Sequence, residues 1–311
     1  MDTKKIGIIY VIFLLFGILT SACDSPNQKK APKSKPLVVA TTGMIADALK
    51  NIVGDAMRVQ AIMGPGVDPH LYKATREDLS LLREADLIFY NGLHLEGKMG
   101  EVLEKLARQK PIFAIGNQID TKKLHTISPQ SDAIDPHIWF DVLLWSEAIQ
   151  ITTKALIEFD PSKKDLFTKN ANQFLKKLRD LDAEVREQIQ SIDKKRRVLI
   201  TAHDAFGYFG RAYDIEVRGL QGISTVSEFG LKDISDLVDF IVKRKIKAVF
   251  VESSIPKKSL EAVVQGCLQN NHPVKIGGTL FSDAMGAEGT PEGTYLGMLR
   301  YNVKTITEAL K

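Results

Sequence analysis

The sequence predicts an α/β protein made of two parallel-sheet lobes joined by one long rigid helix. Apolar strand patterns alternate with helical patterns in both halves of the chain, and this alternation implies parallel sheets covered on both faces. Between the halves lies the longest helical pattern, which contains no Gly or Pro. A length of 311 residues suits two domains of ordinary size.

Residues 1–22 predict an export signal, specifically a lipoprotein signal peptide. Two lysines precede an apolar run from Ile6 to Leu19 that is short for a membrane span. The small residues before Cys23 resemble a bacterial lipobox, at which lipid is attached to the cysteine and the preceding peptide is removed. Thr20 stands where such sites usually have Leu. An ordinary cleaved signal with a free Cys23 is the alternative.

The composition after this signal indicates a tether and a soluble domain with nearly balanced charge. Residues 23–35 are mostly polar and predict a disordered tether with a reach of about 20 Å. The chain has 42 Lys and Arg against 38 Asp and Glu, and no dense basic stripe, which argues against a nucleic-acid partner. If Cys23 is acylated, Cys267 has no disulfide partner, and its helical context predicts a buried apolar role.

The first lobe is predicted over residues 36–160, where short apolar runs alternate with helical patterns. The predicted strands are Leu37–Ala40, Val59–Met63, Leu87–Tyr90 and Ile112–Ile115. The predicted helices are Met44–Val53, Thr75–Glu84 and Gly97–Arg108.

Residues 161–192 predict the helix that joins the lobes. Apolar side chains recur at helical spacing at Phe167, Ala171, Phe174, Leu178, Leu181, Val185, Ile189 and Ile192. At 1.5 Å per residue, a helix from Ser162 to Ile192 would be roughly 46 Å long and could cross from one lobe to the other. A coiled-coil partner is the competing interpretation, but about four heptads without further repeats favour packing within the chain.

The second lobe is predicted over residues 193–311 and repeats the α/β plan. The predicted strands are Val198–Thr201, which runs into His203, then Glu216–Leu220, Ala248–Val251 and Val274–Ile276. The predicted helices are Leu231–Arg244, Lys258–Gln269 and Thr290–Leu310. The glycine-rich stretch 277–286 is expected to leave the last strand as a loop.

The tripeptide Asp-Pro-His occurs twice, ending at His70 and at His137. Proline restricts its own backbone and that of the residue before it, so each histidine leaves a stiff corner that can aim its ring. The apolar spacing after the second copy places His137 at or near a helix start. The positive end of that helix is expected to keep the ring neutral, as metal binding requires. A single copy would be read as a turn or cap; the pair favours a metal site.

Four donors are expected to meet between the lobes. In open α/β sheets, ligands collect beyond the carboxyl ends of strands. His70, His203 and Asp283 each follow a predicted strand, and His137 begins a helix. Three imidazoles and one carboxylate suit zinc and also accept manganese or iron(II). We therefore predict one divalent metal ion bound by His70, His137, His203 and Asp283.

The chain resembles the metal-binding lipoproteins of zinc and manganese ABC importers (cluster A-I, TroA-like), from Pro36 nearly to the end. The motifs that carry the resemblance are Val67–His70, Asn91–Glu96, Asp135–Asp141, Thr201–Phe206, Glu252–Pro256 and Phe281–Met285. The resemblance implies two lobes around the four metal ligands. It also implies that the loaded protein docks on a membrane permease driven by a cytoplasmic ATPase.

The donor set bears on the choice of metal. Family members regarded as manganese-selective commonly carry Glu where this chain has His203, and nitrogen donors shift the preference toward zinc. Dedicated zinc binders often carry a long loop rich in His and acidic residues before the second metal-binding histidine. In this chain the corresponding interval, residues 116–134, contains a single histidine, His125. The chain resembles members that accept both metals, so we expect zinc first, manganese close behind and iron third.

Several other polar residues are expected to be ordinary. His94, His125 and His272 sit in turn or surface contexts. Asp68 and Asp135 are predicted to be caps and not ligands. Asp204 and Glu252 could support the ligands, but capping or solvated roles explain them equally well.

The predicted function is capture of one divalent ion outside the cytoplasmic membrane and its delivery to the permease. The protein is expected to be a monomer, exported and either lipid-anchored at the outer face of that membrane or periplasmic. Four protein ligands leave no position for a reactive water, so no enzymatic activity is expected. The alternatives are a metallohydrolase that uses the same residues and a surface adhesin. Affinity is expected to weaken as the pH falls through roughly 6.5, the ordinary histidine range.

Overall fold

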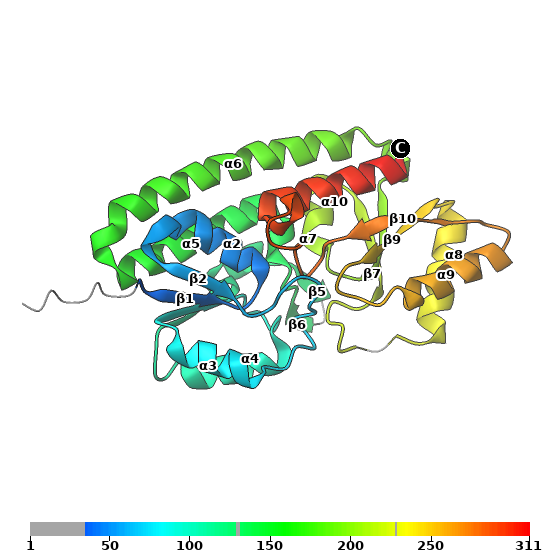
Figure 1. The fold of residues 1–311 in the computed structure, drawn as a ribbon. Coiled ribbons are helices and arrows are strands. Elements are labelled where there is room, and N and C mark those ends of the chain that lie inside the picture. Colours follow the sequence, from blue (N-terminus) through cyan, green and yellow to red (C-terminus); the bar gives the residue numbers. More distant parts are fainter. Residues whose placement is uncertain (1–34, 129–130, 228) are drawn as a thin grey trace, which may run out of the picture. The chain divides into compact units, whose positions relative to one another are not determined.

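The structure is a computed structural model, and it describes residues 35–128, 131–227 and 229–311 (Figure 1). The predicted export signal, with Cys23, lies outside the described residues, as does the predicted tether apart from Lys35. None of the described helices is both long and apolar enough to cross a bilayer.

The first lobe is built on a parallel sheet with the strand order β2-β1-β3-β4. Its strands are β1 (Leu37–Ala40), β2 (Arg58–Ala61), β3 (Leu87–Tyr90) and β4 (Ile112–Ala114). Val38 and Ala40 of β1 share a core with α2 (Gly43–Val53). Leu37 and Val39 share another with α3 (Arg76–Glu84) and α4 (Gly97–Leu106). Because side chains alternate along a strand, helices cover both faces of this sheet, as predicted (Figure 1).

The second lobe contains two parallel strand pairs that lie side by side. The pairs are β7 (Val198–His203) with β8 (Glu216–Gln221), and β9 (Ala248–Glu252) with β10 (Lys275–Leu280). Helices α8 (Leu231–Arg244) and α9 (Lys258–Gln269) cover one face. Helices α7 (Gly207–Tyr213) and α10 (Tyr295–Leu310) pack into the core on the other face. Two α/β lobes are therefore confirmed, while the exact lobe boundaries stay predictions.

The predicted long helix is α6 (Lys164–Gln190), and it contacts both lobes. It has 27 residues and follows a 3₁₀ turn at Pro161–Lys163, so it is two residues shorter than predicted at each end. Its buried side chains are Phe167, Ala171, Phe174, Leu178, Leu181, Val185 and Ile189, as its apolar spacing predicted. α6 packs against α5 (Val142–Phe159) and α2 on the first-lobe side and against α10 on the other (Figure 1). One uninterrupted helix thus ties the lobes together.

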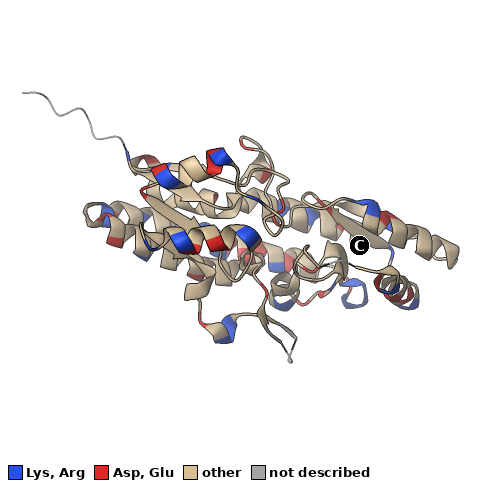
Figure 2. Ribbon diagram, turned by 90° about the horizontal axis from the view of Figure 1, so that it is seen from below, with Lys and Arg blue, Asp and Glu red and all other residues tan. Residues whose placement is uncertain are grey.

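Charged residues of both signs are interspersed along the helices in Figure 2. Several form ion pairs one helical turn apart, such as Lys176 with Asp180 on α6 and Lys232 with Asp236 on α8. Exposed pairs of this kind contribute little to stability, because water and salt screen the two charges. The stability of the two lobes therefore rests on their buried apolar cores.

Four features of the fold differ from the sequence predictions. The antiparallel hairpin β5 (Thr126–Ser128) with β6 (Ser131–Ile134) and the helix α7 were not predicted. Gly277 and Gly278 lie inside β10, where the strand register shifts, and not in a loop after it. A Cβ on Gly277 would come within 2.9 Å of Phe250 and Ala309, so glycine is needed for α10 to pack on the strand. The last helix begins at Tyr295, after a separate 3₁₀ turn.

Candidate metal centre

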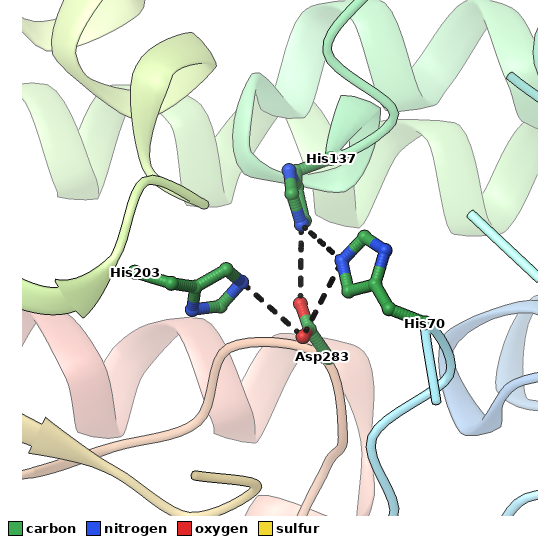
Figure 3. Close-up of side chains that lie close together, drawn as sticks. All are labelled: His70, His137, His203 and Asp283. Atoms are coloured by element: carbon green, nitrogen blue, oxygen red, sulfur yellow. Dashed lines mark hydrogen bonds and ion pairs between the residues drawn. The ribbon is translucent and has the colours of Figure 1, made fainter. Parts of the chain in front are cut away.

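Four side chains that are far apart in the sequence meet at the junction of the lobes (Figure 3). His70 lies in the loop after β2, His137 follows β6, His203 is the last residue of β7, and Asp283 follows β10. Each of the four is at most 3% exposed. One donor atom from each lies within 4.8 Å of the others. The structure therefore brings together all four residues that the sequence predicted as metal ligands.

The spacing of the donor atoms suits one small ion. Oδ1 of Asp283 is 3.3 Å from Nε2 of His137, and Oδ2 is 3.3 Å from Nε2 of His203 (Figure 3). Nε2 of His70 is 3.3 Å from that of His137 and 3.9 Å from Oδ2 of Asp283. Ligand atoms around a tetrahedral zinc ion, with bonds of 2.0 to 2.2 Å, stand about 3.3 to 3.6 Å apart. The three contacts of 3.3 Å match this spacing, while the contact of 3.9 Å and the outer limit of 4.8 Å are wider.

Several of these donor atoms are buried and lack a hydrogen-bond partner. These atoms are Oδ1 and Oδ2 of Asp283 and Nε2 of His203. The contact between Asp283 and His203 does not have hydrogen-bond geometry. A buried polar group left without a partner costs about 1 to 3 kcal/mol. A cation bound among them would satisfy all of these atoms at once.

In two of the imidazole rings, a carboxylate contacts Nδ1, the nitrogen that faces away from the other donors. Oδ1 of Asp135 lies 2.7 Å from Nδ1 of His137 and also accepts the backbone N–H of that histidine at 2.9 Å. Oε2 of Glu252 lies 2.6 Å from Nδ1 of His203, a close ionic contact without hydrogen-bond geometry, and Oε1 accepts the His203 backbone N–H at 2.9 Å. Such partners fix the ring orientation and raise the basicity of a metal ligand. Each ring thus presents Nε2 to the centre.

Further hydrogen bonds across the lobes hold the backbone around the centre. The indole N–H of Trp139 donates to the carbonyl of Ser282 at 3.0 Å, directly before Asp283. The hydroxyl of Tyr208 donates to the carbonyl of Asp135 at 2.8 Å. Both Trp139 and Tyr208 are almost fully buried. The segments that carry His137 and Asp283 are therefore fixed by neighbours that are not among the four donors.

The pKa values of two of the imidazole rings differ from the sequence prediction that the ring of His137 is kept neutral. Burial lowers the pKa of His137, but the carboxylates of Asp135 and Asp283 outweigh it and raise the pKa to about 9. Burial likewise opposes protonation of His203, yet Glu252 and Asp283 hold its pKa well above the usual value. The prediction that a helix start keeps His137 neutral was wrong. His137 precedes a 3₁₀ turn, and α5 begins only at Val142.

The pKa values of His70 and Asp283 are both lowered, in contrast to those of the other two histidines. Burial lowers the pKa of His70 to about 3, so that ring is neutral at physiological pH. Burial would raise the pKa of Asp283, but the charges of His203 and His137 hold it well below the usual value. In the absence of a metal ion, two protonated imidazoles therefore surround an ionised carboxylate.

The other polar residues that were not predicted to be ligands lie outside the four-donor cluster. They are His94, His125, His272, Asp68, Asp135, Asp204 and Glu252. His272 contacts the carbonyl of Ile246 at 2.7 Å, and Cys267 is buried as predicted. Asp68 and Asp135 do not cap helices; each accepts the backbone N–H of the histidine two residues later. The support from Asp135 was missed, although the Asp-Pro-His spacing was an available signal for it. The support from Glu252 was one of two roles that the sequence left open.

Glu252→Gln is expected to weaken zinc binding between about tenfold and a hundredfold, the usual effect of removing such a partner from a metal-bound histidine. The substitution keeps the size of the side chain but removes the charge beside Nδ1 of His203. Titration against a zinc-chelating dye measures the effect, and Glu261→Gln on α9, where the side chain is 45% exposed, is the matched control. An affinity unchanged within twofold would show that Glu252 does not support the site.

Two α/β lobes with three imidazoles and one carboxylate buried between them define a two-lobed metal-ion-binding protein. The sequence model of the family described as zinc-uptake complex component A, periplasmic (ZnuA), matches residues 38–309. The chain belongs to this family.

Several proteins that are similar to this chain are described as metal-binding proteins or as components of metal transporters. The manganese-binding lipoprotein MntA of Bacillus subtilis (strain 168) is 47% identical over 301 residues, which cover 97% of each chain. The zinc-binding protein TroA of Treponema pallidum (strain Nichols) is 49% identical over 298 residues, or 96% of each. The metal ABC transporter substrate-binding lipoprotein SsaB of Streptococcus sanguinis is 32% identical over 313 residues, or 99% of each. A solved structure of the periplasmic zinc-binding protein TroA from Treponema pallidum has a TM-score of 0.87, at 50% identity, over 89% of this chain and 99% of that one.

Proposed function

We propose that this protein captures one divalent transition-metal ion with His70, His137, His203 and Asp283 and delivers it to the permease of an ABC importer. The main support is the set of four buried donors, which lie within 4.8 Å of one another. Buried carboxylate oxygens without a hydrogen-bond partner are costly unless a cation fills the space among them.

The donor chemistry favours zinc as the cargo, followed by manganese and then iron. Three imidazole nitrogens and one carboxylate are a usual zinc set, while a carboxylate that binds through both oxygens also suits manganese or iron(II). Both oxygens of Asp283 face the other donors, since each lies 3.3 Å from a different histidine. The relatives MntA and TroA are named as a manganese-binding and a zinc-binding protein, which agrees with a site that accepts either ion.

An acid-lined cavity offers the ion a way to approach Asp283. It has a volume of about 600 Å³ and lies between the first lobe and the segment that carries Asp283. The carboxyl-bearing residues that line it, besides Asp283, are Asp47, Glu77, Asp78 and Glu288. The lining includes one basic residue, Lys50, so the carboxyl groups outnumber it, and a cleft with an excess of negative charge concentrates cations. The ion pair between Lys50 and Glu288, at 2.7 Å, lies at this cavity and joins the two lobes.

The remaining parts of the proposal concern the cell envelope. We propose that the signal in residues 1–22 exports the chain, and that lipid on Cys23 anchors it outside the cytoplasmic membrane. The partners are a permease and its cytoplasmic ATPase, and the protein acts as a monomer without enzymatic activity. Related proteins such as MntA and SsaB are described as lipoproteins, which supports the anchor.

Metal analysis of the purified protein tests the proposal. Protein prepared without added metal is expected to contain close to one zinc or manganese ion per chain, and competition between the two ions ranks them. Chains that bind neither ion would refute the proposal. Turnover of ester or peptide substrates that disappears in His203→Ala would instead support a metallohydrolase.

A further inference from the structure

A loop of the second lobe reaches across to the segment that carries His70. The hydroxyl of Thr225 donates a hydrogen bond of 2.7 Å to Oδ2 of Asp68, 157 residues away in the sequence. The other oxygen of the same carboxylate, Oδ1, accepts the backbone N–H of His70 at 2.9 Å. One carboxylate therefore joins a metal-ligand candidate of the first lobe to a loop of the second.

The loop around Thr225 is itself fixed to the strand pair that carries His203. In the β7–β8 pair, His203 stands opposite Gln221. The side-chain amide of Gln221 donates to the carbonyl of Thr225 at 2.7 Å and also to the carbonyl of Ser227. A continuous path thus runs from His203 through Gln221, Thr225 and Asp68 to His70, and this path does not pass through the metal site.

His70 depends on such support more than the other two histidines do. His137 and His203 each have a carboxylate against Nδ1, and His203 ends a buried strand. His70 lies between β2 and α3, beyond the end of any strand or helix, and Asp68 holds it through its backbone. The side chain of Thr225 is only half-buried, so its hydrogen bond closes the rim of the site where water can compete.

We propose that Thr225 is a positioning residue that holds the His70 segment closed over the bound ion and slows its release. This inference rests on the proposed function of the site. The ion leaves only when the segments that carry its ligands separate, and the bond between Thr225 and Asp68 must break in that step. Loss of the hydroxyl therefore lowers the barrier to release, while the four donors themselves stay in place.

The test is the rate at which zinc passes from the loaded protein to an excess of a chromogenic chelator in stopped flow. Thr225→Val keeps the shape of the side chain and removes the hydroxyl, and it is expected to speed release about tenfold, equal to about 1.4 kcal/mol. Thr225→Ser restores the hydroxyl and is expected to release zinc at the wild-type rate. Val226→Ala, at a neighbouring exposed position of the same loop, is the matched control and is also expected to match the wild type.

A double-mutant cycle separates positioning through Asp68 from a general loosening of the loop. In an Asp68→Asn background, Thr225→Val is expected to change the release rate by less than about twofold, because the pair is already weakened. The inference is overturned if Thr225→Val releases zinc within twofold of the wild type, if Thr225→Ser is as fast as Thr225→Val, or if the effects of the two substitutions simply add. A wild-type protein that binds no zinc would instead overturn the proposed function, so the two failures are distinguishable.

Discussion

Replacement of Asp283 with Ala is expected to weaken zinc binding about a thousandfold. Asp283 is the only anionic donor among the four, and its two oxygens contact two different histidines. Binding of zinc by four ligands is worth about 10 to 16 kcal/mol, so an average ligand accounts for about 2.5 to 4 kcal/mol. That range corresponds to about a hundredfold to a thousandfold in affinity. The upper value is expected because the remaining donors are all neutral.

Competition against a tight zinc chelator measures this loss, with circular dichroism as the check that the variant folds. Asp180→Ala is the matched control because Asp180 is an exposed carboxylate on α6, far in sequence from any of the four donors. An affinity of Asp283→Ala within tenfold of the wild type would exclude Asp283 from the ligand set, and unchanged affinity in His203→Ala as well would show that the ion is held elsewhere.

The positions of the metal-ligand candidates could be predicted because simple sequence signals fix them. His203 ends a run of apolar residues that forms the buried strand β7, and the carboxyl ends of parallel strands face the usual ligand side of such sheets. The repeated Asp-Pro-His tripeptide marked His70 and His137. The apolar repeat of α6 likewise predicted a helix long enough to contact both lobes.

The supporting contacts could not be predicted in the same way. Glu252 reaches His203 only because β9 lies beside β7, and no local pattern reveals which strands become neighbours. The protonation of the rings depends on the same long-range contacts, so the expectation from the helix start failed for His137. Gly277 was misassigned because glycine usually marks a loop, whereas here it admits α10 close to the strand.

Zinc binding at pH 7 is expected to release about two protons from the protein. His137 has its pKa raised to about 9 and His203 well above its usual value, so at pH 7 each ring carries a proton on both nitrogens. Zinc displaces the proton on Nε2 of each ring, while the proton on Nδ1 stays and faces the carboxylate behind it. His70, with its pKa lowered to about 3, and Asp283, with its pKa held low, release none. Because the raised pKa values favour the protonated, ion-free protein, the affinity falls as the pH falls. For two protons the affinity falls about a hundredfold per pH unit between pH 8 and 6. The fall begins near pH 9, above the window near 6.5 expected for ordinary histidines.

Calorimetric titrations in buffers of different ionisation enthalpy count the released protons directly. Asp135→Asn removes the carboxylate that most raises the pKa of His137, so the count is expected to fall toward one. His94→Gln alters an exposed histidine outside the four-donor cluster and is expected to leave the count unchanged. A count near zero at pH 7, or an affinity that is constant between pH 8 and 6, would mean that the rings are already neutral in the ion-free protein. The carboxylates behind them would then serve only to orient the rings, and protons would not compete with the metal for the site.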